Sequence, residues 1–165
     1  MKDATELGLK LSFKSKISKD LYIATDPRLL ERVLRNLISN ALKFTDQGGV
    51  RVRLKSTTNS IILSVIDTGK GIPNKLQGVI FEEFSQIPSK NELVENSGAG
   101  LGLSIAKRLN SKIGGELIIR STENLGSIFS IRLPADYAKP NQSKATELEQ
   151  ALEQTIIPQI TLTDP

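Results

Sequence analysis

Residues 26–44 read DPRLLERVLRNLISNALKF, and this stretch decides the fold. Asp26 is a favoured N-cap residue and Pro27 is tolerated in a first turn, so a helix is predicted to begin here. Apolar side chains then recur at helical spacing to about Phe44, and the Gln-Gly-Gly run at 47–49 ends the helix. The apolar positions are Leu30, Val33, Leu34, Leu37, Ile38 and Ala41. The sequence therefore predicts one long amphipathic helix with a single buried face.

Strand patterns flank this helix. Residues 9–14 alternate apolar and polar side chains, and residues 21–25 are predicted as a second short strand. After the helix, residues 50–55 and 60–67 are predicted to pair as a hairpin around the turn at 57–59.

A second helix and a last hairpin follow. The glycine-rich run 98–103 leads into a helix that ends near Ile113, and residues 116–121 pair with residues 126–133. We therefore expect an α+β fold, a two-layer α/β sandwich whose mixed sheet of about five or six strands has its helices on one face. Pro134 marks the edge of this domain.

Residues 135–165 differ from the rest of the chain in charge. Residues 1–134 hold 20 basic and 13 acidic side chains, whereas residues 135–165 hold 2 basic and 5 acidic ones. A chain of 165 residues is long enough for one domain but not for two. We therefore expect one domain over 1–134 and an acidic linker or tail over 135–165, with a short acidic helix at 146–155.

The composition excludes several kinds of chemistry. With no cysteine and no histidine, the chain cannot form thiolate zinc sites, cysteine nucleophiles or histidine general bases. Seven aromatic residues and no dense basic cluster argue against nucleic-acid binding. The longest apolar run is four residues, so we expect no membrane insertion by this chain and a cytoplasmic location.

The predicted first helix also carries a polar stripe. Asn36, Asn40 and Lys43 stand at i, i+4 and i+7, which places them on one side of the helix. A solvated face would explain any one of them, but two asparagines are unusual inside a helix because asparagine is a poor helix former. An amide oxygen can bind a hard cation such as Mg²⁺ together with substrate phosphates.

Two glycine-rich segments could bind a flat, charged ligand. Asp67 ends an apolar strand and opens the loop DTGKGIP at 67–73, where a carboxylate can accept a hydrogen bond from a nucleobase amine and Gly69 and Gly71 allow close approach. An ordinary turn is the alternative. The run 98–103 could present backbone N–H groups to phosphate, and the polar residues 85–97 before it are predicted to form a mobile lid.

Four motifs follow one another in a specific order, at 34–45, 67–73, 80–86 and 98–103. Together they closely resemble the nucleotide-binding boxes of sensor histidine kinases, and residues 125–134 are similar to the closing strand of that family. The resemblance covers about residues 7–134. It implies the catalytic and ATP-binding domain of a two-component histidine kinase, with the Bergerat-type (GHKL) fold of gyrase, heat-shock chaperone and mismatch-repair ATPases.

The resemblance also implies roles for individual residues. Asn40 would ligate Mg²⁺, Asn36 and Lys43 would face the phosphates as the catalytic residues, and Phe44 would pack by the nucleoside. Asp67 would bind the adenine amine. The remaining residues that the resemblance assigns to ATP are Ser127 as the support of that carboxylate, Gly69, Gly71 and Ile72 in the adenine pocket, Phe81 and Phe84 as anchors of the lid, and Gly98, Gly100, Leu101, Gly102 and Leu103 at the phosphates.

The sequence departs from this family in two places. Family lids usually carry a basic residue just before the triple glycine, whereas residues 93–97 read LVENS and Lys90 is the nearest substitute. The phosphate acceptor of the family is a histidine, and this chain has none. The resemblance therefore implies two partners: a histidine-bearing dimerisation and acceptor domain, in the parent chain or in trans, and a downstream response-regulator receiver domain, with a parent protein that can be membrane-bound.

Two other functions stay open at this point. ATPases of the gyrase or chaperone type resemble the same pattern, but they place a glutamate that activates water where Asn36 stands. An amide cannot accept that proton, so Asn36 favours phosphoryl transfer over hydrolysis. A non-catalytic nucleotide-sensing module is the other alternative, because the lid is acidic.

Overall fold

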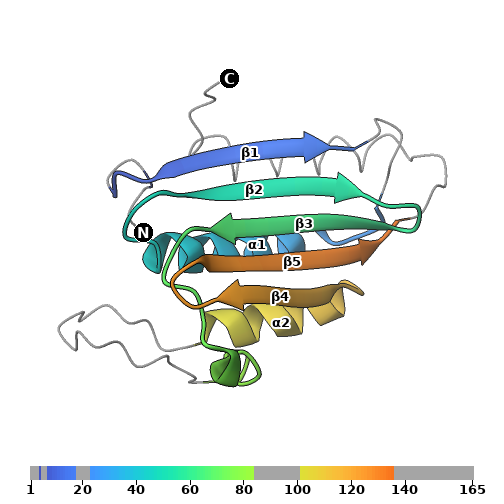
Figure 1. Cartoon of the computed structure of the whole chain (residues 1–165). Coiled ribbons are helices and arrows are strands. Elements are labelled where there is room, and N and C mark those ends of the chain that lie inside the picture. The colour runs from blue at the N-terminus through green and yellow to red at the C-terminus, as the bar shows by residue number, and fades with distance from the viewer. Residues whose placement is uncertain (1–3, 5–6, 18–22, 84–100, 136–165) are drawn as a thin grey trace.

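One five-stranded sheet and two helices make up the computed structural model, which describes residue 4 and residues 7–17, 23–83 and 101–135 (Figure 1). The elements in chain order are β1 (Lys10–Lys16), α1 (Pro27–Lys43), β2 (Gly49–Ser56), β3 (Ser60–Asp67), the 3₁₀ turn η1 (Asn74–Leu76), α2 (Gly102–Lys112), β4 (Glu116–Thr122) and β5 (Gly126–Pro134).

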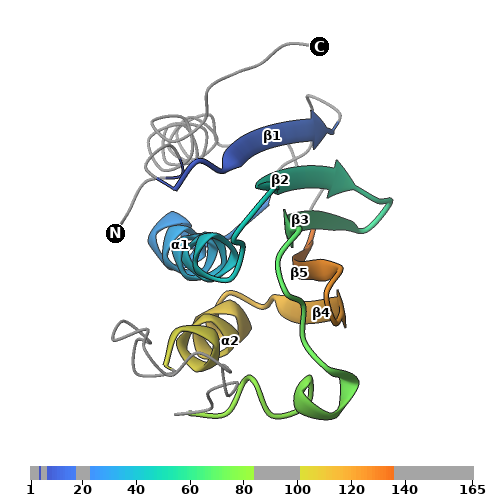
Figure 2. The same ribbon diagram turned by 60° about the vertical axis from the view of Figure 1, so that its left-hand side comes forward.

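The strands lie in the order β1-β2-β3-β5-β4. β1 and β2 are parallel, because α1 connects them, and the remaining neighbours are antiparallel. Figure 2 shows α1 and α2 on the same face of the sheet. The predicted α+β sandwich with a mixed sheet is therefore confirmed.

Helix α1 begins and is buried as its sequence predicts. The side chain of Asp26 accepts hydrogen bonds from the backbone N–H groups of Arg28 at 2.9 Å and Leu29 at 3.2 Å. Its apolar face is buried against the sheet through Leu30, Val33, Leu34, Leu37, Ile38, Ala41 and Leu42. This burial holds the polar stripe that flanks the apolar face of α1 in a fixed orientation.

The sheet contributes the other half of the core. Burial alternates along β2, β3 and β5, so every second residue faces the helices. The largest fully buried sheet residues are Val50, Val52, Val65 and Ile131. These residues are β-branched, a side-chain shape that fits a strand packed on one face.

Some predicted elements differ from the structure or lie outside it. Ile23, Ala24 and Thr25 form no strand, so the strand predicted over 21–25 is wrong where the chain is described, and the sheet has five strands. Leu21, Tyr22, the predicted lid at 85–97 and the predicted helix at 146–155 lie outside the described residues. Among the described helices, none is long and apolar enough to cross a membrane.

Candidate functional site

The polar stripe of α1 faces the beginning of α2. Asn36 and Asn40 are half-buried, and Lys43 is exposed one turn further on. A Cβ on Gly102, the first residue of α2, would lie 3.7 Å from Asn40 Nδ2 and 3.9 Å from Asn36 Oδ1. The two amides therefore lie directly against the N-terminus of a helix, where backbone N–H groups favour negative charge.

Asp67 lies at the end of β3 with one carboxylate oxygen held and the other free. Its Oδ1 accepts hydrogen bonds from the backbone N–H of Gly69 at 2.9 Å and of Ser127 at 3.1 Å. Among the described residues no hydrogen bond to Oδ2 is formed, although the Ser127 hydroxyl, which pairs with Ser121, also lowers the pKa of this carboxyl group. The side chain thus offers one acceptor of fixed orientation to a donor such as a nucleobase amine.

Burial sets the electrostatics of this carboxyl group. Asp67 is 6% exposed. Desolvation raises its pKa above the ordinary value of 3.8, and the hydrogen bonds from Gly69 and Ser127 oppose that shift. A buried carboxylate with an unused acceptor is unusual in a structural turn, which makes Asp67 a candidate binding residue.

The loop after Asp67 packs tightly on the end of α1. A Cβ on Gly69 would overlap the carbonyl oxygen of Phe44, and that oxygen accepts a hydrogen bond from Lys70 N–H at 3.2 Å. Gly71 has a φ of +63°, and a Cβ there would overlap the carbonyl oxygen of Thr122. Both glycines are therefore required by the packing of the loop itself.

The other end of the loop is fixed to the β4–β5 hairpin. The N–H of Ile72, which is 7% exposed, donates to Ser121 Oγ at 2.8 Å. Ser121 Oγ in turn lies 3.0 Å from Ser127 Oγ, and Gln77 Nε2 donates to the carbonyls of Ile72 and Ser121, each at 2.9 Å. Sequence reasoning missed Ser121 and Gln77, because nothing in a single sequence marks a serine or glutamine that acts through its neighbours.

Two lysines share the ring of Phe44. Lys43 Nζ lies 5.1 Å and Lys70 Nζ 4.8 Å from the ring centroid. The sequence predicts Lys43 and Phe44 as site residues, whereas Lys70 stands in it only as part of the glycine-rich loop. The structure thus adds a second cation beside the aromatic ring between the asparagine pair and the Asp67 loop.

The predicted phosphate end is described only in part. Leu101 caps α2 and its carbonyl accepts from Ser104 Oγ at 2.9 Å, while Leu103 packs against the core. Gly102 is the one glycine of the predicted triplet that the structure describes; Gly98, Gly100 and Phe84 lie outside the described residues. Leu101, Gly102 and Leu103 lie where α2 meets the polar stripe of α1.

Phe81 lies in a different place from the other described site residues. It lines an open groove of about 470 Å³ together with Ser104, Lys107, Arg108 and other residues of α2, and Lys107 Nζ lies 5.5 Å from its ring centroid. Asp67 and the asparagines do not line this groove. The structure therefore brings Phe81 to α2 and not to the Asp67 loop.

The side chains near the N-terminus of α2 are better suited to a cation that a bound ligand also coordinates than to a cation held by the protein alone. The described residues contain no group of three or more His, Cys, Asp or Glu side chains that could hold a metal ion. Asn40 offers an amide oxygen next to the N-terminus of α2, where an anionic ligand would supply further oxygens. Such a site suits Mg²⁺, which keeps phosphate and water oxygens among its ligands.

Comparison with known proteins finds relatives in both sequence and fold. Residues 25–137 match the family described as histidine kinase-, DNA gyrase B-, and HSP90-like ATPase. The chain is 38% identical over 129 residues to the sensor protein TorS of Escherichia coli, a match that covers 77% of this chain and 14% of TorS. The chain thus spans a small part of the length of this relative.

Two solved structures share the fold. The crystal structure of full-length ShkA in complex with AMPPNP matches with a TM-score of 0.71 and 31% identity, over 83% of this chain and 28% of that chain. The nucleotide-free catalytic domain of the histidine kinase ThkA matches with a TM-score of 0.66 and 26% identity, over 79% of this chain and 83% of that one.

Proposed function

Because the chain belongs to the histidine kinase-, DNA gyrase B- and HSP90-like ATPase family, we propose that it binds ATP with Mg²⁺ and passes the γ-phosphoryl group to a histidine of a separate dimerisation and acceptor domain. Its relatives identify it as a histidine kinase ATP-binding domain. We assign residues 1–134 to this domain and residues 135–165 to an acidic linker or tail; the family match over residues 25–137 supports the greater part of this assignment.

The observation that carries the proposal is the free Oδ2 of Asp67. Its partner oxygen is fixed by Gly69 and Ser127, so Oδ2 is oriented before any ligand arrives. The adenine amine needs such an acceptor. Gly69, Gly71 and Ile72 form the loop beside it, and Phe44 with Lys43 lies between this loop and the asparagine pair.

The opposite end of the site is assigned to the triphosphate. Asn40 would hold Mg²⁺ together with the phosphates, and Asn36, Lys43 and the N-terminus of α2 would face the phosphate charge. When bound, Mg²⁺ supplies charge neutralisation at the phosphates. Leu101, Gly102 and Leu103, with Gly98 and Gly100, would complete this end, and Phe81 and Phe84 would anchor the lid.

Transfer needs a nucleophile that this chain lacks, since it contains no histidine. An imidazole nitrogen of the acceptor would form the bond to the γ-phosphorus as the bond from that phosphorus to the bridging oxygen breaks, which leaves ADP. The contribution of this chain is positioning and charge neutralisation. Asn36 offers no base for water, so hydrolysis stays slow and the ATPase alternative is disfavoured.

The proposed partners follow from the same chemistry. The acceptor domain belongs to the parent protein or to a second chain, and a receiver domain takes the phosphoryl group from its histidine. We place this ATP-dependent domain in the cytoplasm, whether or not its parent is bound to a membrane.

Radiolabelled ATP tests the proposal directly. The chain is incubated with γ-labelled ATP and Mg²⁺, alone and with a dimeric helical acceptor domain from the same parent, and a His→Gln variant of that acceptor is the control. We expect acid-labile label on the intact acceptor and none on the control or on this chain. Label on this chain, or rapid phosphate release without an acceptor, would contradict the proposal.

A further inference from the structure

Lys70 is an exposed loop residue whose backbone is nevertheless fixed at both of its polar groups. Its N–H donates to the carbonyl of Phe44 at 3.2 Å, and its carbonyl accepts a hydrogen bond from the N–H of Asn124 at 2.7 Å. The first bond connects the loop to the end of α1, and the second connects it to the turn between β4 and β5. The side chain of Lys70 therefore starts from a defined position.

This side chain extends over the ring of Phe44. Lys70 stands between Gly69 and Gly71, and the packing of those two glycines holds the loop against the carbonyls of Phe44 and Thr122. From there Lys70 Nζ reaches a point 4.8 Å from the centroid of the Phe44 ring. The loop that holds Asp67 thus also places a cation on the aromatic ring.

Lys43 approaches the same ring from α1. Its Nζ lies 5.1 Å from the ring centroid, so the two ammonium groups lie within about 10 Å of each other, which is about one Debye length at 0.1 M salt. Each ammonium group is attracted to the ring, but the two repel each other. A bound anion near the ring would attract both and offset this repulsion.

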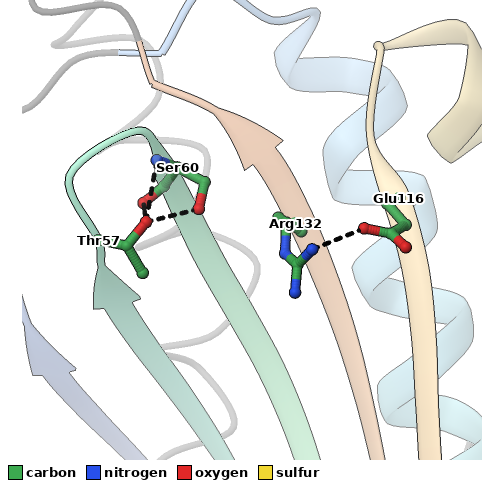
Figure 3. Close-up of polar contacts among 4 residues, drawn as sticks. All are labelled: Thr57, Ser60, Glu116 and Arg132. Carbon is green, nitrogen blue, oxygen red and sulfur yellow. Dashed lines mark hydrogen bonds and ion pairs between the residues drawn. The ribbon is translucent and has the colours of Figure 1, made fainter.

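Neither lysine has an acidic partner within the described part of the chain. The ion pairs that form there are Arg35 with Glu31, Arg108 with Glu83 and Arg132 with Glu116. Figure 3 shows the last of these, which joins β5 to β4 at 3.0 Å. Asp46 and Asp67, the acidic residues nearest to the two lysines in the sequence, pair with neither of them. Two cations without acidic partners beside one ring suit an anionic ligand.

The two lysines come from opposite ends of the site proposed for ATP. Lys43 follows Asn40 by three residues, at the end assigned to the triphosphate, and Lys70 follows Asp67 by three residues, at the end assigned to adenine. The side chain of Phe44 lies between them. A nucleotide with its base at Asp67 and its last phosphates at Asn40 has its ribose and first phosphate between these positions. The α-phosphate is therefore the anion expected where the two lysines meet.

We propose that Lys70 binds the α-phosphate of the nucleotide, and that Lys43 binds the phosphates beyond it. This inference rests on the proposed function, from which it takes the positions of the adenine and of the triphosphate. The role of Lys70 is binding and positioning. A cation at the α-phosphate adds affinity that AMP, ADP and ATP share and that adenosine lacks.

Affinities for adenosine, AMP and ADP test this proposal. They are measured by isothermal titration in EDTA, so that no metal ion contacts the phosphates. Lys70→Met removes the charge but keeps an unbranched side chain, and we expect it to weaken AMP and ADP binding by the same factor of about tenfold, because one charge-assisted contact is lost at the phosphate they share. Adenosine affinity should not change, and Lys70→Arg should restore most of the AMP affinity.

Lys75→Met is the matched control. It removes the same charge from an exposed position on η1 and should leave all three affinities unchanged. AMP affinity that is equal in the wild type and in Lys70→Met would overturn the proposal, even if ADP binding were weakened, because Lys70 would then contact a later phosphate. Equal losses in Lys70→Met and Lys75→Met would also overturn it, by showing an effect of net charge alone.

Adenosine distinguishes the failure of this inference from the failure of the proposed function. If Asp67→Asn weakens adenosine binding while Lys70→Met leaves AMP affinity unchanged, the adenine site stands and only the role of Lys70 is lost. A wild-type chain that binds none of the three ligands would remove both.

Discussion

Asp67 and Ser127, 60 residues apart in the chain, are joined by a hydrogen bond of 3.1 Å from the Ser127 backbone N–H to Asp67 Oδ1. The bond connects the end of β3 to the start of β5, and with the bond from Gly69 it leaves Oδ2 as the acceptor that we assign to the ligand. The position of the candidate adenine acceptor therefore depends on the pairing of two strands and not on the loop alone.

Asp67→Asn is expected to weaken ADP binding more than tenfold while the fold stays intact. The amide oxygen can still accept hydrogen bonds from Gly69 and Ser127. The amide nitrogen then takes the place of Oδ2, and its N–H groups would face the N–H groups of the adenine amine, so that no hydrogen bond can form. Loss of a charge-assisted hydrogen bond costs on the order of 1.5–3 kcal/mol. Isothermal titration checks this, with the exposed Asp46→Asn as control; unchanged affinity in Asp67→Asn would remove the pocket assignment.

The pH dependence of stability should carry a signature of Asp67. Burial raises the pKa of this carboxyl in the folded state above its ordinary value of 3.8. The folded state then holds the proton more tightly than the unfolded state, so the contribution of Asp67 to the free energy of unfolding falls as pH rises from 3.8 through the folded pKa, and is constant above it.

Asp67→Asn does not titrate and provides the reference. Urea unfolding of both proteins across this window should give a wild-type free energy of unfolding that declines relative to the variant as pH rises. A difference that grows with pH would mean that the hydrogen bonds, and not burial, dominate the pKa of Asp67.

Asn40→Ala is expected to remove the Mg²⁺ dependence of ATP binding with little loss of stability, because its side chain is half-buried and faces the N-terminus of α2. ATP affinity is compared with Mg²⁺ and with EDTA. The exposed turn residue Asn59 provides the control variant Asn59→Ala. If Asn40→Ala keeps the wild-type difference between the two conditions, the metal is held elsewhere.

Periodicity predicted the parts of the fold that local burial determines. The helix begins at Asp26 and the hairpins lie where the alternation of apolar residues placed them, because each of these elements buries one regular face. The strand predicted over 21–25 is wrong at residues 23–25, which pair with no strand of the described sheet, and a short apolar run does not reveal whether it will find a partner. Pairing partners are a property of the whole sheet.

The candidate site also contains residues that the sequence can predict and residues that it cannot. Asn36, Asn40 and Asp67 could be named as candidates from the sequence because they stand in ordered motifs that resemble those of a known family. Ser121, Gln77 and Lys70 could not, because their roles arise from contacts across the chain, such as the bond from Ile72 N–H to Ser121 Oγ at 2.8 Å.

Gly126→Ala should destabilise the protein by about 1–3 kcal/mol. Gly126 has a φ of +99°, and a Cβ there would overlap the carbonyl oxygen of Asp67. The strain falls on the strand pair that positions the carboxylate, so ADP affinity should fall as well. Gly78→Ala is the matched control, since no atom lies within 4 Å of a Cβ at that position. Urea unfolding and titration with ADP measure both effects; equal stability of the two variants would contradict the expectation.

Asn36→Glu should convert part of the transfer chemistry into hydrolysis. Asn36 Oδ1 lies where a Cβ on Gly102 would be 3.9 Å away, at the end of the site assigned to the phosphates. A glutamate there gives water a general base, a contribution that typically amounts to about 10²–10⁴-fold when the base is well positioned. We expect phosphate release from ATP to rise at least about tenfold, since the wild-type backbone was not shaped around a glutamate. Asn36→Gln has the same length without a base and should show no rise. A coupled phosphate-release assay at saturating ATP distinguishes the two variants. If both release phosphate at the wild-type rate while ATP affinity is unchanged, Asn36 is not near the γ-phosphate, and the preference for transfer over hydrolysis must come from the lid or from the acceptor.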